Sequence, residues 1–343
     1  MPQIEMSAPL SVLDEAGHPV NFGWARSPFF IYDASLFRGR AQRVTSSDRY
    51  IISSPTHLIL LEILDGGYLG YAGISVISLK DKKRSTQIFQ TLIPLGSMGL
   101  PDSGESGPVR FQRKKRANIE FIPMKDGIRL IKVDIPKFGH HRYLRGAVVL
   151  TPSVQAESLV THIPWRSEKN AFVLSRRAPW YIAEGMMQFG TTEIVFTKGN
   201  AWGILDWSRG SRPRSDVHYW ASACGISGGC QTGFSVGYGS ADASAGTENA
   251  FFVDGKLHKL DQVTFHISPT SWLEPWRFTG NDNRLEMTFF PEQERVERHR
   301  LGFHTLARRQ VCGSFSGNVI LDNGMKLEFR NITGIAERRT TRF

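Results

Sequence analysis

The chain has 343 residues and a formal net charge of +10, with 41% hydrophobic and 22% charged residues. A chain of this length exceeds the usual size of a domain with a single hydrophobic core, so we expect two domains or one large β assembly. Either can bury a core large enough to be stable without disulfide bonds. The three cysteines are an odd number without metal-ligand spacing, which argues against a disulfide framework and favours a reducing compartment.

The N-terminal segment MPQIEMSAPLSVLDEAG has neither the basic start nor the apolar core of a secretory signal. No stretch of the chain approaches the roughly 20 apolar residues of a membrane-spanning helix. We therefore expect a cytoplasmic protein.

Strand, turn, strand patterns follow along the chain, first over residues 57–79 and again over residues 117–135. Between them, residues 96–108 (GSMGLPDSGESGP) are rich in Gly, Pro and Ser and predict a loop. No stretch keeps a helical period of 3.6 beyond two turns. Tight-turn sequences that supply positive φ angles separate the β-rich runs and predict hairpins at Asp65-Gly66-Gly67, Asp126-Gly127, Gly228-Gly229, Asp254-Gly255 and Asn323-Gly324.

Many short antiparallel strands with a turn about every ten residues predict an all-β fold of barrels or sandwiches, and closure into barrels removes exposed strand edges. We expect two lipocalin-like antiparallel barrels packed together. The Pro-containing break LTPSVQ, residues 150–155, separates two predicted strands. It predicts an N-terminal domain over residues 1–151 and a C-terminal domain over residues 152–343.

The segment WGILDWSRG, residues 202–210, combines acid, hydroxyl and aromatic side chains in one predicted strand. Asp206 and Ser208 share one face of this strand, and Trp207 and Arg209 share the other. One interpretation makes Asp206 a proton donor facing a cavity, because burial disfavours an unpaired carboxylate. The alternative is structural, with Trp202, Trp207 and Arg209 forming the cation–π plug that closes one end of small lipid-binding barrels.

A second polar strand, HYWASACG, places His218, Trp220 and Ser222 on one face. We expect His218 to act as an acid or base beside Trp220, although a lone histidine in a strand is more often a structural residue. In the next strand, QTGFSVGYG, glycines leave one face bare. Tyr238 lies on the other face, as a further candidate ligand contact.

Three carboxylates complete the candidate site. Glu248 and Asn249 follow a Ser/Gly loop and precede an apolar run, so we expect Glu248 at a strand mouth where a ligand enters, with a solvated loop carboxylate as the alternative. Glu62 lies in a run that is apolar on both faces, so it either pairs with an arginine or lines a cavity. Glu157 and Arg177 are candidate partners across the domain boundary.

Metal and nucleotide sites are not expected. The ten histidines include no H-E-x-x-H pattern, and the neighbours His140 and His141 cannot chelate a metal from one strand face. No glycine-rich nucleotide motif follows a strand and opens a helix, so we expect no cofactor. The G-x-S-x-G match at residues 225–229 precedes another strand, which indicates a hairpin turn and not a hydrolase site.

The positive charge gathers in KDKKR (residues 80–84), RKKR (residues 113–116) and RRTTR (residues 338–342), at predicted turns or the tail. A nucleic-acid surface would interleave aromatic residues with such charges, and this chain does not, so we expect solvated hairpin ends and no nucleic acid partner. A weak attraction to anionic membrane surfaces stays open.

The segments LDWSRG, HYWASA and GTENAFFVDGKLHKLD, with FSGNVILDNG and GIAERR, resemble an uncharacterised domain-of-unknown-function family of the two-barrel calycin superfamily. That superfamily is similar to carotenoid 1,2-hydratase, tocopherol cyclase and the fungal lipocalin-like Diels–Alderases. The resemblance covers most of the chain and is clearest over residues 200–270. It implies a pocket at or between two barrels that takes a hydrophobic ligand without a redox cofactor.

Within this resemblance we expect a polyene, isoprenoid or polyketide-like ligand and a cofactor-free cyclisation, hydration or isomerisation. Local chemistry makes Asp206 the proton donor, Trp207 and Trp220 the walls of the ligand site, and Glu248 or His218 the group that takes a proton or orients water. The alternative is a non-catalytic lipid or isoprenoid carrier. The oligomeric state does not follow from the sequence.

Overall fold

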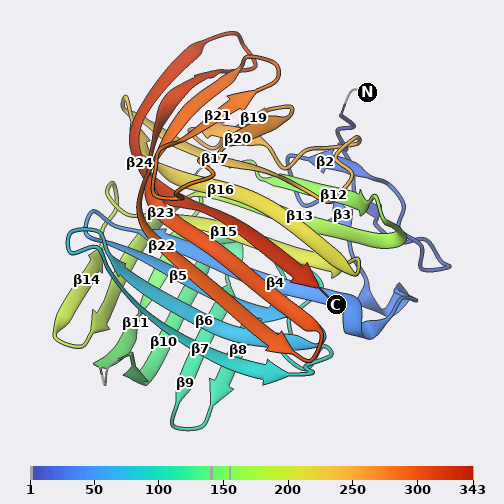
Figure 1. Ribbon diagram of the computed structural model, residues 1–343, viewed down its shortest axis with the longest axis horizontal. Helices are drawn as coiled ribbons and strands as arrows, with labels where there is room; N and C mark the ends of the chain where they lie inside the picture. Colours follow the sequence, from blue (N-terminus) through green and yellow to red (C-terminus); the bar gives the residue numbers. More distant parts are fainter. Residues whose placement is uncertain (1–2, 140–141, 154–155, 343) are drawn as a thin grey trace.

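The computed structural model describes residues 3–139, 142–153 and 156–342, and nearly all of this part of the chain is β-structure (Figure 1). Two large antiparallel sheets, of 13 and 9 strands, each curl into a barrel-like shape, and a small parallel pair joins β1 (Leu10–Ser11) to β3 (Phe30–Ile31). In the described ranges the helical segments are short 3-10 turns only: η1 (Ala34–Leu36), η2 (Ala41–Arg43) and η3 (Lys125–Gly127). The predicted all-β fold of two packed lipocalin-like barrels is confirmed.

The first sheet follows the order β7-β6-β5-β4-β15-β13-β11-β10-β9-β8, with β12 and β14 paired to β13 and β2 paired to β12. Its strands are β2 (Gly23–Ala25), β4 (Val44–Ser53), β5 (His57–Asp65), β6 (Leu69–Ser78), β7 (Lys83–Leu92), β8 (Val109–Arg113), β9 (Ala117–Pro123), β10 (Arg129–Phe138), β11 (Arg142–Thr151), β12 (Leu159–Trp165), β13 (Glu168–Phe189), β14 (Thr192–Phe196) and β15 (Trp202–Ser211).

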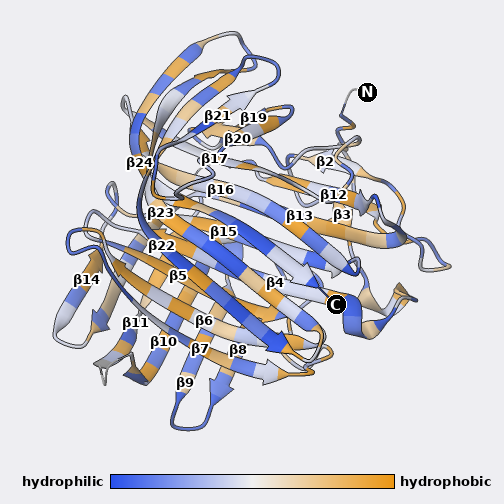
Figure 2. Ribbon diagram, in the orientation of Figure 1, coloured by the Kyte–Doolittle hydropathy of each residue, from blue (hydrophilic) through white to orange (hydrophobic). Residues whose placement is uncertain are grey.

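The second sheet follows the order β19-β18-β17-β16-β24-β23-β22-β21-β20. Its strands are β16 (Ser215–Ser227), β17 (Cys230–Gly239), β18 (Ala250–Val253), β19 (Lys256–Lys259), β20 (Val263–His266), β21 (Trp276–Gly280), β22 (Leu285–Leu301), β23 (His304–Ile320) and β24 (Lys326–Arg342). The long strands β22 to β24 extend across the outer face of the first sheet, and Figure 2 shows that their ends there are strongly hydrophilic.

The predicted hairpin turns are confirmed, because each of the five turn sequences lies between two consecutive antiparallel strands. Both residues have positive φ at Asp126-Gly127, Gly228-Gly229 and Asp254-Gly255. This is the backbone geometry that twisted two-residue hairpin turns require. The glycine match at residues 225–229 accordingly forms the turn between β16 and β17.

The chain passes from the first sheet to the second between β15 and β16, at residues 212–214. The segment 150–155 lies within the run of strands that build the first sheet, and its residues 154 and 155 are outside the described part of the chain. The division after residue 151 therefore remains a prediction. Beyond this segment the long strand β13 pairs with β11 and with β15 and so continues the first sheet.

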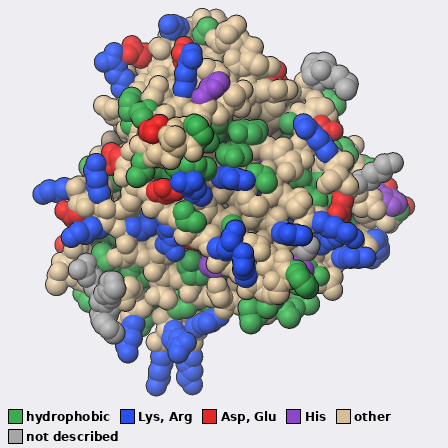
Figure 3. All heavy atoms as spheres, viewed as in Figure 1, with side chains coloured by type: hydrophobic (Ala, Val, Ile, Leu, Met, Phe, Trp, Pro, Cys, Tyr) green, Lys and Arg blue, Asp and Glu red, His purple; other side chains and the backbone are tan. Residues whose placement is uncertain are grey.

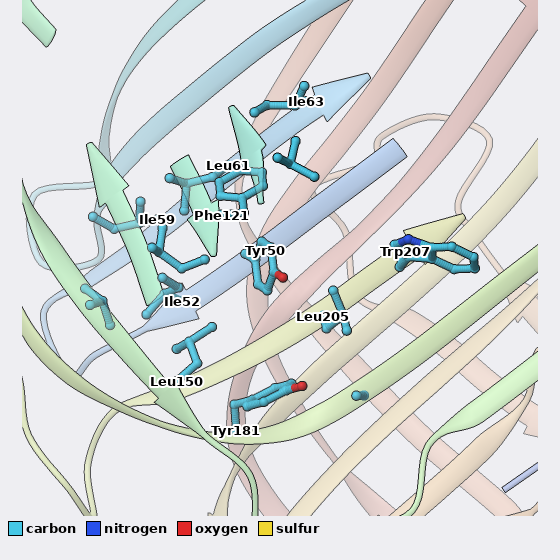
Figure 4. Packing of buried hydrophobic residues seen from close by; sticks show 14 of the residues in the cluster. Tyr50, Ile52, Ile59, Leu61, Ile63, Phe121, Leu150, Tyr181, Leu205 and Trp207 are labelled. Carbon is cyan, nitrogen blue, oxygen red and sulfur yellow. The ribbon is translucent and has the colours of Figure 1, made fainter. Parts of the chain in front are cut away.

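Three apolar clusters hold the molecule together. One fills the first barrel, where Tyr50, Ile59, Leu61 and Phe121 point inward (Figure 4). A second fills the other barrel, and a third lies between the two sheets and includes Trp220. β5 contributes to two of them, because its alternate residues face the first barrel and the second sheet, and this explains why both of its faces are apolar.

Among the described residues, no helix combines the length and apolar character needed to cross a membrane. The basic segments 80–84 and 113–116 lie at the turns β6–β7 and β8–β9, as predicted. Lys and Arg side chains are prominent at the end of the molecule where the β8–β9 turn projects (Figure 3). The prediction was wrong for residues 338–342, which lie within β24 and pair with β16 and β23 instead of forming a tail.

Candidate functional site

A row of alternating charges crosses the first sheet on the face that packs against the second barrel. Glu62 on β5, Arg49 on β4, Asp206 on β15 and Arg177 on β13 are successive cross-strand partners in the sheet register. Directly opposed side chains of opposite charge stabilise an antiparallel pair. The row therefore fixes four neighbouring strands in one register while placing four charged groups in the interface.

Asp206 lies at the centre of this row and binds two guanidinium groups. Arg49 Nη2 lies 2.8 Å from its Oδ2, and Arg177 Nη1 pairs closely with its Oδ1. Arg177 also reaches Glu248 with Nη2, at 3.3 Å. Asp206 thus serves as the shared acceptor of two arginines.

The second sheet supplies the complementary charges. Glu337 on β24 accepts from Arg49 Nη1 at 2.8 Å, and Arg308 on β23 donates to Glu62 through Nη1 at 2.5 Å. Gln310 on β23 donates to Glu337 at 2.9 Å. All of these side chains are buried. An alternating network of carboxylates and guanidinium groups therefore joins the two barrels, which compensates the cost of removing each charge from water.

Trp220 covers this network from the second barrel. Its ring lies 4.5 Å from the guanidinium carbon of Arg49 and 5.6 Å from that of Arg177, and its Nε1 donates to Ser235 Oγ at 2.9 Å. In a desolvated interface such cation–π contacts are strengthened. Trp220 thus packs on the arginines of the network, and its predicted role as the wall of a ligand site stays a prediction.

His218 and Glu248 form one end of the network. His218 Nε2 lies 2.5 Å from Glu248 Oε2, and the two side chains keep 14% and 11% of their surface exposed. Gly237 leaves room for the pair, because a Cβ at this position would lie 3.4 Å from both polar atoms. A carboxylate on one ring nitrogen fixes the orientation of an imidazole and leaves the other nitrogen for proton exchange.

Electrostatics keep the buried carboxylates ionised. Burial alone would raise the pKa of Glu62, but Arg308 and Arg49 outweigh burial and lower this pKa to about 2. Burial likewise opposes ionisation of Glu248, but His218 and Arg177 hold the pKa of Glu248 below its usual value. Burial would also raise the pKa of Glu337, but Arg49 and Arg308 hold this pKa below its usual value. These groups are therefore acceptors at neutral pH.

A small, partly open hollow with a volume of about 30 Å³ lies beside Glu62. Leu60, Ile74 and Ile88 form apolar walls, and Tyr71 donates to Glu62 Oε2 at 2.7 Å. Glu62 therefore pairs with an arginine, and the hollow beside it is too small for more than about one water molecule.

Trp207 lies on the opposite face of β15 from Asp206, inside the first barrel (Figure 4). The guanidinium carbon of Arg209 lies 4.6 Å from the Trp207 ring, and Arg209 pairs with Asp48 at 2.7 Å. This is the geometry of the structural plug considered for Trp207 and Arg209. Asp206 is separate from the plug and belongs to the charged row.

Four other predicted site residues lie away from the network. Tyr238 is 43% exposed and stacks on Tyr219, and Ser222 donates to the carbonyl of Phe234. Asn249 bridges backbone groups, accepting from Gly237 N and donating to Asp261 O. Glu157 pairs with Arg26 and accepts from Leu257 N near the barrel rim.

Sequence reasoning did not find Arg49, Arg308 or Glu337. Arg49 and Glu337 lie in strand segments whose neighbouring residues are largely buried, SSDRYIIS and GIAERR. A charged residue in such a strand was a usable signal, because charged side chains are rarely buried unless they are paired. In the described part of the chain, no group of three or more His, Cys, Asp or Glu is placed to hold a metal. His140 and His141 lie outside the described residues.

The fold and this interface define a two-barrel, lipocalin-like protein with a charged network between its barrels. The chain belongs to the family described as Domain of unknown function (DUF2804), whose model matches residues 3–343. The predicted membership of an uncharacterised family is thereby confirmed. A comparison with curated proteins found no match.

Solved structures of the same fold are distant in sequence. CghA is 11% identical with a TM-score of 0.54, over 88% of this chain and 89% of that one, and CghA has also been solved with Sch210972. A Nitrosomonas europaea protein assigned to AttH is 12% identical with a TM-score of 0.50, over 86% and 92% of the two chains. Kievitone hydratase from Nectria haematococca is 10% identical with a TM-score of 0.47, over 87% and 88%. At these identities the first two likenesses establish the fold alone, and the third carries no argument.

Proposed function

We propose that this protein binds a hydrophobic small molecule at the interface of its two barrels and catalyses a cofactor-free cyclisation, hydration or isomerisation by proton transfer. The observation that carries the proposal is the His218–Glu248 pair, which is largely buried and lies at the end of a charged network covered by Trp220. A histidine held by a carboxylate in a water-poor site is an effective general base or acid.

In this proposal His218 exchanges the proton. Glu248 engages Nε2, so Nδ1 is the nitrogen that faces the reacting molecule. Arg177 joins Glu248 to Asp206 and so positions the carboxylate behind the imidazole. Asp206 acts through Arg177 instead of donating a proton itself, because a carboxylate shared by two arginines is an acceptor. Of the three expected catalytic residues, His218 alone exchanges a proton in this proposal, while Glu248 and Asp206 position it, so the role of proton donor expected for Asp206 is not proposed.

The apolar surroundings support a hydrophobic ligand. Trp220 and Leu60 belong to an apolar cluster that lies between the two sheets. CghA, which shares the fold, has been solved with the compound Sch210972, in keeping with small-molecule binding by this architecture. Such sites combine apolar walls with a few fixed polar groups.

A non-catalytic carrier is the second candidate, and the completeness of the charged network favours it. Every carboxylate of the charged network has an arginine partner. Joining the two barrels is therefore enough to account for the network without a catalytic role. A carrier would bind the same class of ligand without altering it.

The test starts from protein purified gently from its own source, with native mass spectrometry and identification of any small molecule extracted from it. That compound is then incubated with wild type, His218→Gln, Glu248→Gln and the control His266→Gln, an exposed histidine that contacts Thr279. The proposal expects the first two variants to bind the compound but to lose turnover by about 100-fold or more, with the control unchanged. Wild type that binds the compound and never converts it supports the carrier.

A further inference from the structure

The interior of the first barrel contains an arginine that the charged network does not use. Arg129 begins β10, and its side chain is 1% exposed. It shares the inward face of that strand with Ile131 and Val133, which belong to the barrel core. A buried guanidinium group is costly unless it is paired, so its partner carries information about what this site binds.

The partner of Arg129 comes from outside the barrel wall. Glu105 belongs to the loop of residues 93–108 between β7 and β8, and its Oε1 accepts from Arg129 Nη2 at 2.7 Å. Arg176 on β13 pairs closely with the same oxygen. The Glu105 side chain is 39% exposed, so it reaches from the surface to two arginines that are largely buried.

Glu105 leaves much of this site unused. Arg129 Nε and Nη1, Tyr181 Oη and Trp207 Nε1 are buried and have no hydrogen-bond partner among the described residues. A guanidinium group presents a fork of donors that matches both oxygens of a carboxylate, whereas Glu105 engages Arg129 through one nitrogen. The unused donors fit an anion seated more deeply in the barrel than the Glu105 carboxylate.

The loop that carries Glu105 covers the end of the barrel through small contacts. Gly104 lies against the Trp207 indole, where an added Cβ would be 3.4 Å from Nε1. The carbonyl of Pro101 accepts from Arg209 at 2.8 Å, and Asp102 accepts from the backbone of Ala34 at 2.8 Å. Figure 4 shows that Trp207, Tyr50 and Tyr181 line the same barrel interior.

We propose that Arg129 and Arg176 form a binding site for the carboxylate of a hydrophobic acid, and that Glu105 occupies this site when no ligand is bound. The ligand carboxylate replaces Glu105 and pairs with the free nitrogens of Arg129, and Tyr181 donates to it. The apolar part of the ligand lies against Trp207 at the barrel end, in space that the residues around Gly104 vacate. This site is separate from the His218–Glu248 pair and goes beyond the function proposed above.

The probes are cis-parinaric acid, a polyene fatty acid, and its methyl ester, which has the same chain without the charge. Binding is followed by the probe fluorescence and by the melting temperature of wild type and Glu105→Gln. The variant removes the competing carboxylate but retains the length of the side chain. Asp102→Asn is the matched control, because it removes a charge from the same loop without touching either arginine.

We expect Glu105→Gln to bind the acid about tenfold more tightly than wild type, with no such gain for the ester, because the acid alone replaces the lost ion pair. The acid should also restore the melting temperature that the substitution lowers. Adding Arg129→Met to Glu105→Gln should abolish the preference for the acid.

Equal gains for acid and ester, or a similar gain in Asp102→Asn, would show that only loosening of the loop matters and would overturn the proposal. Failure of Glu105→Gln to bind the acid would overturn it as well. Neither result bears on turnover at His218, so the two proposals stand or fall separately.

Discussion

Arg49 is the cation whose loss should cost the most stability. It lies in the middle of the charged row and binds Asp206 and Glu337, each at 2.8 Å, while Trp220 covers its guanidinium group at 4.5 Å. Its side chain is 4% exposed, so water cannot replace these partners. Arg49→Met retains the aliphatic bulk and leaves two buried carboxylates facing each other across the interface.

The expected loss follows from these contacts. Breaking a buried ion pair by removing one partner costs about 3–5 kcal/mol. A desolvated cation–π contact contributes about 2 kcal/mol more. We therefore expect Arg49→Met to lower the free energy of unfolding by about 5–7 kcal/mol, against a typical total of about 5–15 kcal/mol.

The assay is urea unfolding followed by tryptophan fluorescence, because Trp220 reports directly on this interface. Arg145→Met is the matched control, since Arg145 pairs with Asp134 on the surface at 3.1 Å and such pairs contribute about 0–1 kcal/mol. Glu337→Gln alone and together with Arg49→Met gives the coupling energy of the pair. A loss below about 1 kcal/mol in Arg49→Met, no greater than in the control, would refute a network that joins the barrels.

Three further predictions concern single residues. Glu62 has a folded pKa of about 2, below its ordinary value of 4.5, so its ion pair stabilises the fold fully above about pH 4.5 and this contribution is lost as the pH falls toward 2. Glu62→Gln should therefore lower the free energy of unfolding by about 3 kcal/mol at neutral pH. Urea unfolding at stepped pH should also show a flatter stability profile for this variant between pH 4.5 and 2. Burial lowers the pKa of His162 to about 4, so the unfolded chain takes up a proton more readily than the folded chain and stability falls as the pH drops from about 6.5 to 4. His162→Phe should remove this dependence of stability on pH. A variant with the same profile of stability against pH as wild type would contradict the prediction. Arg209→Met should lower stability by about 3 kcal/mol and change the near-ultraviolet circular dichroism of Trp207, whereas an unchanged Trp207 signal would argue against their stacking.

The all-β fold could be predicted because its signals are local. Turn sequences such as Asp126-Gly127 determine a hairpin within a few residues, and alternation with a period of two identifies a strand. The order of strands in the sheets could not be predicted this way. β4 pairs with β15, and no local sequence pattern indicates which distant strand pairs with the free side of a given strand.

The same limit applies to the site. The sequence singles out Asp206, Glu248 and Glu62 one at a time and offers Arg177 only as a possible partner, and the structure brings all four into one network. Their partnership depends on Arg49, far from Asp206 in sequence. Residues that are neighbours in sequence can also lie apart, because Trp207 directly follows Asp206 and yet faces the opposite side of the sheet.

The pairing of β4 with β15 also affects how the chain folds during synthesis. Until residues 202–211 leave the ribosome, β4 lacks one neighbour and presents an open edge with Ile51 and Arg49 uncovered. Arg49 gains Glu337 only when the final strand is complete. Long-range pairing of this kind is slow and leaves the nascent chain prone to aggregation. The first sheet is therefore completed only when β15 has been made, and the charged interface between the barrels waits for the last strand of the protein.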